Sequence, residues 1–394
     1  MNVCLFTDSF LPKIGGMELA VHYLANSLCE RGCKVTVVAK YYPGETPFTH
    51  QYALRQYGNR IPFSGRSGLD TIAGIATLVR ANFDNPFDLV NSHGASYAAS
   101  RVYLAGKSGL LKKPWIVTPH GGDIQMVPDV NYGIRLNPKW DRIVRRNIQA
   151  ADHVTAISTS ILKQLEFIPP EKRSIIPNGI HLNEFAKGDR GFLQNYLNLS
   201  ADEKIVLSVG RNRKVKGYEY GILAFAAIKK NWPQCPLKYV IIGKNTSNLH
   251  PLIRNTNLQN TVFTIPQMSR DEIVKSYSSA WCFLSPSLSE GLSLVSIEAI
   301  ACGLPLIVSD VPGNSDIVKD NSCGIVVKAK DPNEISRKLI HLLEHPREYA
   351  LYKSRALERA PRYDWTVIAD RYIQVYREVT GRKEHLLNQL QATS

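Results

Sequence analysis

The sequence predicts an α/β protein made of two doubly wound, Rossmann-like domains that face each other across a cleft. Three observations lead to this prediction. The 394 residues exceed what one ordinary hydrophobic core accommodates. Short apolar runs of strand length alternate with helical patterns in two successive series, as parallel βαβ units require. Polar, glycine-rich loops follow the predicted strands, at the sheet edge where ligands bind in such folds.

The first series begins with a β-loop-α-β unit. A strand in VCLFT (3–7) leads through the loop FLPKIGG (10–16) into the helical pattern MELAVHYLANSLCERG (17–32), and KVTVVAK (34–40) is the second strand. Gly32 stands where the C-cap of that helix is expected. Further buried strands are predicted within FDLVNSHG (87–94), WIVTPHGGD (115–123), HVTAIS (153–158) and SIIPNG (174–179).

The second series predicts another doubly wound sheet. Its strands are expected within KIVLSVG (204–210), KYVIIG (238–243), TVFTIP (261–266), WCFLSP (281–286), PLIVSD (305–310) and GIVVK (324–328). The two series are separated near 180–202, and the linker PNGIHLNEFAKGDRG (177–191) has little periodicity and is predicted to be a hinge. We therefore expect domains at 1–182 and 183–365. The helical pattern at 365–379 has no strand after it, so residues 366–394 are expected to cross back to the first domain.

Composition excludes several classes of protein. Hydrophobic residues make up 44% and charged residues 21% of the chain, which argues against disordered and fibrous proteins. No apolar run has the ~20 residues that a membrane span needs. The N-terminus lacks the features of a secretory signal. The seven scattered cysteines form no CxxC pair and no metal-ligand pattern, so reduced thiols and a cytoplasmic location are expected.

Side chains at the predicted strand ends supply candidate chemistry. Gly15 and Gly16 precede a helix, where backbone amides can approach an anion, although a plain turn is the alternative. Arg211 and Lys216 in GRNRKVKG suit a pyrophosphate, with a solvated basic loop as the alternative. Glu290 is expected in a strand-to-helix loop. Glu298 is expected about two turns inside the next helix, in an apolar segment. Hydrogen bonds accepted from sugar hydroxyls would explain a carboxylate at such a position.

These residues belong to a set of motifs that resembles a known family. The motifs are E-x7-E followed by AxxCGxP, the GR-x4-KG loop, PNGIHLNEF, TPHGGD and the opening GGMELAVHYLANSLCERG. Together they resemble the retaining family 4 glycosyltransferases (glycosyl transferases group 1) of GT-B fold, from residue 1 to about residue 379. The resemblance implies a metal-independent hexosyltransferase that moves a sugar from a UDP- or GDP-sugar to an acceptor hydroxyl with retention of configuration. No cofactor and no metal are implied, and the sequence contains no D-x-D triplet.

The resemblance also implies roles for individual residues. Arg211 and Lys216 would neutralise the departing diphosphate, Glu290 would hold the transferred sugar and Glu298 the ribose. His120 would lie beside the sugar. The remaining donor-binding residues would be Gly15, Gly16, Met268, Leu292, Ser293, Leu294 and Val295. The first domain would serve the acceptor and the second the nucleotide sugar.

Two departures from the family pattern are visible. Glu290-Gly291-Leu292-Ser293 replaces the usual EGFG, which puts the donor sugar in doubt. Asp316 stands where a Glu is frequent, and we assign it no role. His93 is an acceptor-side candidate.

Charge points to an anionic partner. The net charge is +14, and residues 101–150 hold nine basic against three acidic residues. Lysines 107, 112 and 113 with Leu110 and Leu111, and the nearby Arg142, Arg145 and Arg146, predict a basic surface able to contact the inner face of an anionic membrane. The acceptor is expected to be a sugar or a lipid-linked sugar in glycan, glycolipid or cell-envelope polysaccharide synthesis. Three alternatives stay open: a GT-B epimerase or sugar-phosphate synthase, a catalytically inactive GT-B protein, and a basic anion- or nucleic-acid-binding protein. No nucleic-acid-binding signature is found, so nucleic acid is not the expected partner.

Overall fold

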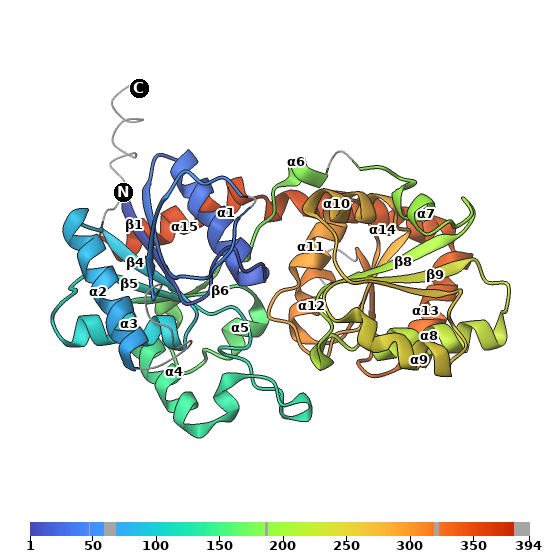
Figure 1. Cartoon of the computed structure of the whole chain (residues 1–394), viewed down its shortest axis with the longest axis horizontal. Helices are drawn as coiled ribbons and strands as arrows, with labels where there is room; N and C mark the ends of the chain where they lie inside the picture. Colours follow the sequence, from blue (N-terminus) through green and yellow to red (C-terminus); the bar gives the residue numbers. More distant parts are fainter. Residues whose placement is uncertain (47, 59–67, 186–187, 319–322, 382–394) are drawn as a thin grey trace. The chain divides into compact units, whose positions relative to one another are not determined.

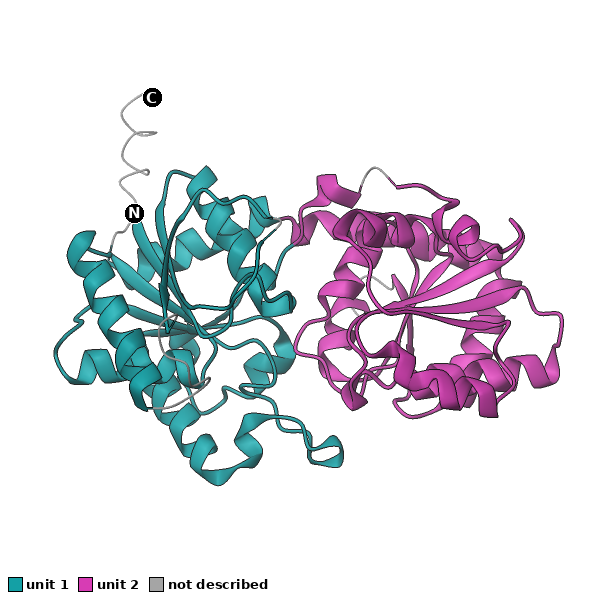
Figure 2. Ribbon diagram, in the orientation of Figure 1, with its two compact units in different colours: residues 1–179, 365–394 teal, residues 180–364 magenta. Residues whose placement is uncertain are grey.

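The computed structural model describes residues 1–46, 48–58, 68–185, 188–318 and 323–381. These residues form two compact units, which Figures 1 and 2 distinguish. Unit 1 comprises Met1–Gly179 together with the chain from Trp365 onward, and unit 2 comprises Ile180–Asp364. Residues 382–394 of the predicted crossover segment lie outside the described residues.

Unit 1 is built on a seven-stranded sheet with the order β3-β2-β1-β4-β5-β6-β7, in which every pair is parallel. The strands are β1 (Asn2–Thr7), β2 (Lys34–Lys40), β3 (Ala53–Tyr57), β4 (Leu89–His93), β5 (Trp115–Thr118), β6 (His153–Ala156) and β7 (Arg173–Ile175). The helices are α1 (Gly16–Glu30), α2 (Gly68–Asp84), α3 (Tyr97–Lys107), α4 (Pro138–Ala150), α5 (Thr159–Lys163) and α15 (Trp365–Val379).

The two faces of this sheet are covered by different helices (Figure 1). Val3 and Leu5 of β1 share one buried cluster with Leu24 of α1 and Tyr372 of α15. Because side chains alternate along a strand, the neighbouring residues of β1 face the opposite side, where Phe6 stacks on Tyr57 at a centroid distance of 6.0 Å. Helix α15 is therefore part of the core of unit 1.

Unit 2 repeats this design with a six-stranded parallel sheet of order β10-β9-β8-β11-β12-β13. The strands are β8 (Lys204–Val209), β9 (Leu237–Ile242), β10 (Val262–Ile265), β11 (Cys282–Ser285), β12 (Leu306–Ser309) and β13 (Gly324–Val327). The helices are α6 (Leu182–Phe185), α7 (Phe192–Tyr196), α8 (Tyr218–Asn231), α9 (His250–Asn255), α10 (Arg270–Ser279), α11 (Leu294–Ala301), α12 (Pro312–Val318), α13 (Pro332–Glu344) and α14 (Pro346–Arg359). The predicted fold class, two Rossmann-like parallel α/β sheets, is confirmed.

The strand order places a topological switch point in each sheet. Strands β1 and β4 are neighbours in unit 1 and β8 and β11 in unit 2, although a long stretch of chain separates the members of each pair. In such sheets ligands bind beyond the carboxyl ends of the strands at this point. The loops that follow β8 and β11, together with helix α11, carry most of the predicted site residues, so these residues gather at one edge of the sheet.

The prediction of an irregular hinge over 177–191 is wrong in part. This stretch contains the short helix α6, the short helix α7 follows directly after it, and both belong to unit 2. Phe185 is buried against Tyr277, with ring centroids 6.2 Å apart, and Leu193 is fully buried. Each helix has four or five residues, which is too short for the apolar periodicity that would identify it in the sequence.

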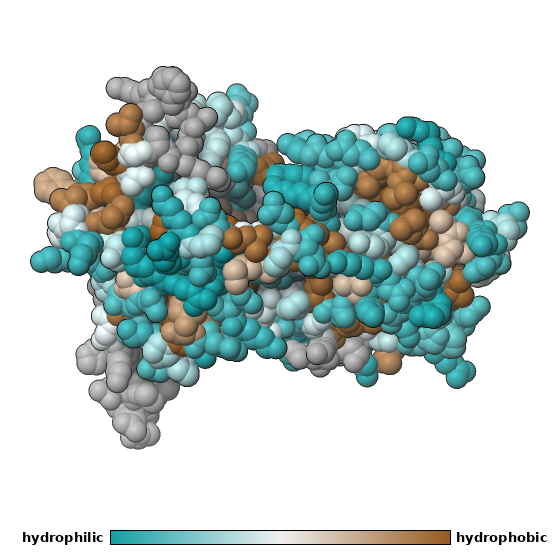
Figure 3. Space-filling model, turned by 90° about the horizontal axis from the view of Figure 1, so that it is seen from below, coloured by the Kyte–Doolittle hydropathy of each residue, from teal (hydrophilic) through white to brown (hydrophobic). Residues whose placement is uncertain are grey.

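The predicted basic surface of unit 1 also needs correction. Leu111 is buried, because its side chain packs into the core instead of facing solvent. Arg145 lies over the ring of Phe167 and Arg146 over that of Tyr103, at 4.8 and 4.2 Å. Lys107, Lys112 and Leu110 are exposed. Large apolar side chains are exposed nearby on α2, and Figure 3 shows apolar atoms at the end of unit 1 that carries this helix. They are Leu69, Ile72 and Phe83.

Candidate functional site

The loop after β8 is held against the loop after β11. Gly217 has a φ of 60°, and a Cβ atom there would lie 2.2 Å from the carbonyl oxygen of Pro286. The Leu288 amide donates a hydrogen bond of 2.7 Å to the carbonyl oxygen of Val215. Only glycine permits this approach with that backbone conformation. The contact brings Lys216 to the loop that carries Glu290.

Lys216 and Glu290 form an ion pair. The Lys216 Nζ lies 2.6 Å from Glu290 Oε1, and the Ser287 hydroxyl donates to the same oxygen at 2.8 Å. The side chains are 23% and 11% exposed, so the pair is partly shielded from water but open to a ligand. Arg211, in the same loop as Lys216, is half-buried and has no ion-pair partner among the residues that the structure describes. The sheet edge thus carries the Lys216–Glu290 pair, and Arg211 is in the same loop as Lys216.

The helix that follows begins with free amides. Ser293 is the N-cap of α11, but its hydroxyl accepts a hydrogen bond from the Ser296 hydroxyl and does not cap the backbone. The amides of Leu294 and Val295 have no partner within the described parts of the chain. Leu292 and Ser293 are buried beneath them. Unsatisfied amides at the positive end of a helix dipole are a ready site for an anion.

Glu298 lies deeper in α11 and is also paired. Arg270 Nη1 donates to Glu298 Oε1 at 2.6 Å, and the Tyr277 hydroxyl donates to Oε2 at 2.8 Å. The prediction of two turns into the helix is wrong, since Glu298 is the fifth residue of α11 and lies about one turn inside. The helix starts later because residues 290–293 are loop. Met268, half-buried, precedes α10 and accepts from the Ser276 hydroxyl at 3.4 Å.

In unit 1, the Gly15–Gly16 turn lies against a carboxylate. Gly15 is the N-cap of α1, and Glu18 in the first turn lies so close that a Cβ at Gly15 would be 2.5 Å from Oε2. The Ser9 hydroxyl donates to Glu18, and Lys13 Nζ donates to Ser9 at 2.9 Å. Glu18 is buried. The turn is therefore fixed by a side chain that the sequence analysis did not single out.

His120 pairs with His93 beyond the ends of β4 and β5. The His93 Nδ1 and His120 Nε2 atoms are 3.0 Å apart, and the other ring nitrogens, His93 Nε2 and His120 Nδ1, are buried with no partner in the described structure. Burial lowers the pKa of both imidazoles, and for His93 the neighbouring His120 lowers it further. Asp123 accepts from the His120 amide at 3.0 Å and orients this loop.

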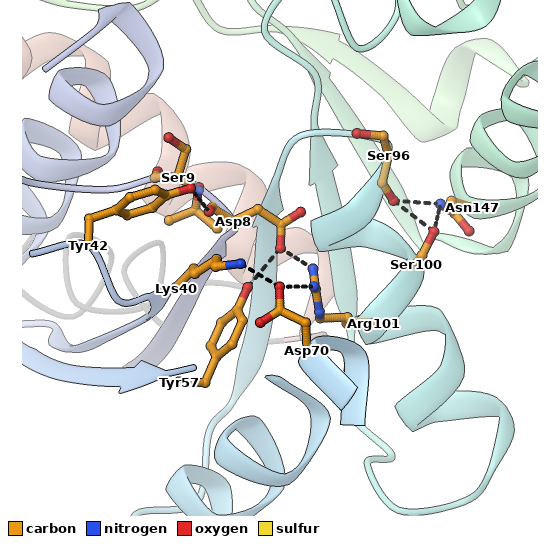
Figure 4. A network of polar contacts seen from close by, with 11 residues as sticks. Asp8, Ser9, Lys40, Tyr42, Tyr57, Asp70, Ser96, Ser100, Arg101 and Asn147 are labelled. Atoms are coloured by element: carbon orange, nitrogen blue, oxygen red, sulfur yellow. Dashed lines mark hydrogen bonds and ion pairs between the residues drawn. The ribbon is translucent and has the colours of Figure 1, made fainter. Parts of the chain in front are cut away.

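A third polar cluster in unit 1 lies at the ends of β1, β2 and β3 (Figure 4). Arg101 of α3 pairs with Asp8 and lies 3.7 Å from Asp70, and Lys40 lies 2.6 Å from Asp70. The Tyr57 hydroxyl donates to Asp8 at 2.8 Å. Burial raises the pKa of the Asp8 carboxyl, although Arg101 and Tyr57 oppose the shift. Two cations offset two carboxylates, so this buried cluster is neutral overall.

Comparison with known proteins identifies the family. Residues 14–184 match the family model described as Glycosyltransferase Family 4, and residues 189–359 match Glycosyl transferases group 1. The chain is a family 4 glycosyltransferase of GT-B fold. The glycosyltransferase is 25% identical over 392 residues to D-inositol 3-phosphate glycosyltransferase 2 of Catenulispora acidiphila, covering 92% of this chain and 90% of that protein. It is 24% identical to N-acetyl-alpha-D-glucosaminyl L-malate synthase of Bacillus anthracis, covering 93% and 95%.

Solved structures share the fold of this glycosyltransferase. Sucrose-phosphate synthase of Thermosynechococcus elongatus superimposes with a TM-score of 0.80 at 21% identity, covering 97% of this chain and 100% of that one. HepE of Anabaena, solved in complex with UDP and glucose, superimposes with a TM-score of 0.78 at 19% identity, covering 96% and 100%. The predicted family and fold are confirmed, and the activity class is glycosyl transfer.

The sequence analysis found both carboxylates of the unit 2 site and Lys216, the partner of Glu290, but not the partners of Glu298. Arg270 and Tyr277 are on α10, and nothing in the spacing of their neighbours marks them. Glu18 had one signal, its position three residues after the N-cap Gly15, where a capping-box glutamate stands.

The part of the chain that the structure describes contains no group of three His, Cys, Asp or Glu side chains placed to hold a metal ion. Its seven cysteines are all free thiols. In the same residues, no helix combines the length and the apolar character that crossing a bilayer requires.

Proposed function

We propose that this glycosyltransferase moves a hexose from a UDP- or GDP-sugar to an acceptor hydroxyl with retention of configuration, in glycan, glycolipid or cell-envelope polysaccharide synthesis. The observation that carries the proposal is the meeting of the free α11 amides with Lys216 and Glu290 at one edge of the unit 2 sheet. This combination offers donors to a diphosphate and an acceptor to sugar hydroxyls. The solved complex of HepE with UDP-glucose supports a nucleotide-sugar donor.

The proposed mechanism is a front-face displacement. The acceptor hydroxyl attacks the anomeric carbon from the side of the leaving group, and a donor phosphate oxygen accepts its proton. Negative charge grows on the diphosphate as the glycosidic bond breaks. Arg211, Lys216 and the amides of Leu294 and Val295 stabilise that charge, so catalysis is mostly electrostatic and positional. The two side-chain cations supply positive charge at the leaving group, and we propose that no metal ion and no cofactor is needed.

The two glutamates receive different hydroxyls in this proposal. Glu290, paired with Lys216, binds hydroxyls of the transferred sugar, and Lys216 turns toward the diphosphate when the donor arrives. Glu298, about one turn inside α11, binds the ribose, with Met268 beside the base. Leu292 and Ser293 shape the pocket for the sugar.

Unit 1 completes the proposed reaction. The Gly15–Gly16 turn lies against the diphosphate, and His120 lies beside the transferred sugar. The acceptor is a sugar or a lipid-linked sugar, and we propose that His93, which pairs with His120, is a residue of the acceptor side.

Two experiments test the proposed reaction. A thermal-shift panel of UDP-, GDP- and ADP-sugars identifies the donor, and transfer assays with the best binder follow. An epimerase acting on the nucleotide sugar would convert the donor without an acceptor, whereas a transferase releases free nucleoside diphosphate only when an acceptor is supplied. A sugar-phosphate synthase would require a phosphorylated acceptor. A protein that binds donor but turns over no acceptor would overturn the proposal.

We also propose that unit 1 contacts the inner face of an anionic membrane. Exposed Lys107 and Lys112 lie near apolar Leu110 in the sequence, and the neighbouring helix α2 exposes Leu69 and Phe83. Cations near an anionic surface contribute about 1 kcal/mol each. Vesicles with anionic lipid should pellet the protein at low salt, and a variant with Lys107 and Lys112 changed to Gln should pellet less. No pelleting at any ionic strength would contradict this surface.

A further inference from the structure

Arg270 is the first residue of α10 and links three elements of unit 2. Its Nη1 contacts Glu298 of α11 at 2.6 Å, and its Nε and Nη2 contact Oε2 of Glu184 of α6 at 3.1 and 3.0 Å. The guanidinium carbon lies 5.0 Å from the centre of the Phe185 ring. A planar fork held at two carboxylates and one ring has little freedom to move.

The two contacts to Glu298 leave both of its carboxylate oxygens able to accept a further hydrogen bond. Arg270 donates to Oε1 and Tyr277 to Oε2, so each oxygen has one protein donor on it. An ionised carboxylate offers about four acceptor positions, two on each oxygen. One position on each oxygen is therefore left for a further donor. Two acceptor positions side by side match the two vicinal hydroxyls of a ribose.

We propose that Arg270 is a positioning residue for the nucleotide: with Tyr277 it fixes the plane of the Glu298 carboxylate so that both oxygens receive the ribose diol. This inference rests on the proposed function, in which Glu298 binds the ribose, and adds the residue that orients it. Glu184 holds Arg270 from the other side. Recognition of the ribose thus depends on a cation that does not touch the nucleotide and on a carboxylate supplied by the segment just after the unit boundary.

The structure favours positioning over two other roles. A cation that binds the phosphates directly must turn away from its carboxylate when the donor arrives, as proposed for Lys216 with its single partner. Arg270 is held by two carboxylates and lies over the Phe185 ring, so it is far less able to turn. A purely structural ion pair would not need to keep Glu298 partly accessible, yet the Glu298 side chain remains 11% exposed beside an Arg270 that is 29% exposed.

Calorimetric titration with nucleotides that lack the diol separates these roles. UDP and GDP are both titrated into the full-length protein, and the tighter binder is compared with its 2′,3′-dideoxy analogue. For the wild type, loss of two hydrogen bonds to a carboxylate should raise Kd about tenfold or more. In Arg270→Gln the Kd of the ribonucleotide should rise by about the same factor, while the Kd of the dideoxy analogue should stay within about twofold.

Matched variants make the result decisive. Arg254→Gln removes an exposed arginine of the neighbouring helix α9 and should leave both affinities unchanged. Tyr277→Phe and Glu184→Gln should weaken the ribonucleotide selectively, and these two carry the test if Arg270→Gln fails to fold. Equal weakening of both nucleotides in the Arg270 variant, or tighter ribonucleotide binding, would overturn the inference. A wild type that does not distinguish the nucleotides would instead contradict the ribose role of Glu298, and with it the proposed function.

Discussion

Both glutamates of the donor site are already paired with a cation in the protein alone. Lys216 contacts Glu290, and Arg270 contacts Glu298, each at 2.6 Å. Holding each charge close to its opposite limits the desolvation penalty that lone partly buried charges would have. A nucleotide sugar offers both hydrogen-bond acceptors and donors, because its phosphate oxygens accept hydrogen bonds and its hydroxyls donate them. At the Lys216–Glu290 pair the donor can therefore offer phosphate oxygens to the lysine and hydroxyls to the glutamate, so neither side chain loses its hydrogen-bond partners. Arg270 stays on Glu298, and the ribose hydroxyls add to the acceptor positions that remain.

Lys216 is expected to act mainly in the transition state. Charge on the diphosphate grows as the glycosidic bond breaks, so Lys216→Ala should lower kcat by about 10²–10³-fold, the scale of losing one oxyanion donor. The donor KM should change much less, because the ground-state contact is weaker. Steady-state kinetics check this, with the exposed Lys230→Ala as the control for lost charge. An effect confined to KM would assign Lys216 to ground-state binding.

Variants of the two glutamates should differ in their affinity for the bare nucleoside diphosphate, as measured by calorimetry. Glu298→Gln should weaken its binding, because the ribose is present in that ligand. Glu290→Gln should leave this affinity nearly intact and impair only sugar transfer, because its partner hydroxyls belong to the sugar. Equal loss of nucleotide affinity in both variants would show that the division of roles is wrong.

At the level of elements, the site depends on loops that hold two strand ends together. Gly217→Ala would place a Cβ 2.2 Å from the Pro286 carbonyl oxygen in a left-handed conformation. We expect it to lower the free energy of unfolding of unit 2 by about 2–4 kcal/mol, from strain and from separation of the loops, and to weaken donor binding. Gly32→Ala is the control, since Gly32 also has a positive φ, of 77°, but has open space around it. Denaturant unfolding compares the two, and equal losses would show that the approach to Pro286 is unimportant.

The two histidines at the ends of β4 and β5, His93 and His120, should make the stability of unit 1 depend on pH. Burial lowers the pKa of His93 and His120 below the unfolded value of about 6.5. The unfolded chain then binds more protons than the folded one as pH falls below about 6.5, so stability is fully present above this pH and decreases below it.

His93→Gln should therefore reduce the fall in Tm between about pH 8 and pH 5.5. His50→Gln, at an exposed position of the same unit, should leave this fall unchanged. The raised pKa of Asp8 acts in the opposite direction but equally in all three proteins. Thermal unfolding at both pH values measures the difference, and parallel profiles for the wild type and His93→Gln would contradict the role of the pair.

The sequence predicts the buried elements better than the edges and the cross-element contacts. The central strands are apolar runs, and all those predicted are present. Strand β3 was not predicted, because ALRQY at the sheet edge is largely exposed and carries Arg55 and Gln56. Spacing within one loop and helix placed Glu290 and Glu298 near each other. Arg270 comes from α10, and only tertiary packing brings it to Glu298, so no local pattern in the sequence could reveal it.

For the whole molecule, the two units have separate hydrophobic cores. One buried cluster joins β1 and β2 with α1 and α15, and the other joins β8 and β9 with α8 and α13. The chain passes into unit 2 after Gly179 and returns at Trp365. Because each core is complete within its unit, the glycosyltransferase is expected to unfold in two transitions, and a single ΔG would not describe it.

Nucleotide binding should stabilise unit 2 against unfolding much more than unit 1. The residues proposed to bind a bare nucleoside diphosphate are almost all in unit 2, with only the Gly15–Gly16 turn in unit 1. At a concentration of 100 Kd the ligand should stabilise unit 2 by about 2.7 kcal/mol, which raises its midpoint by about 5–10 °C. Replacing Trp232 and Trp281 by Phe leaves three tryptophans, all in unit 1, to report that unit by fluorescence, while circular dichroism reports both units. We expect the nucleotide to raise the fluorescence midpoint, which reports unit 1, much less than the dichroism midpoint that belongs to unit 2. Equal shifts of both would show that unit 1 supplies as much of the nucleotide site as unit 2.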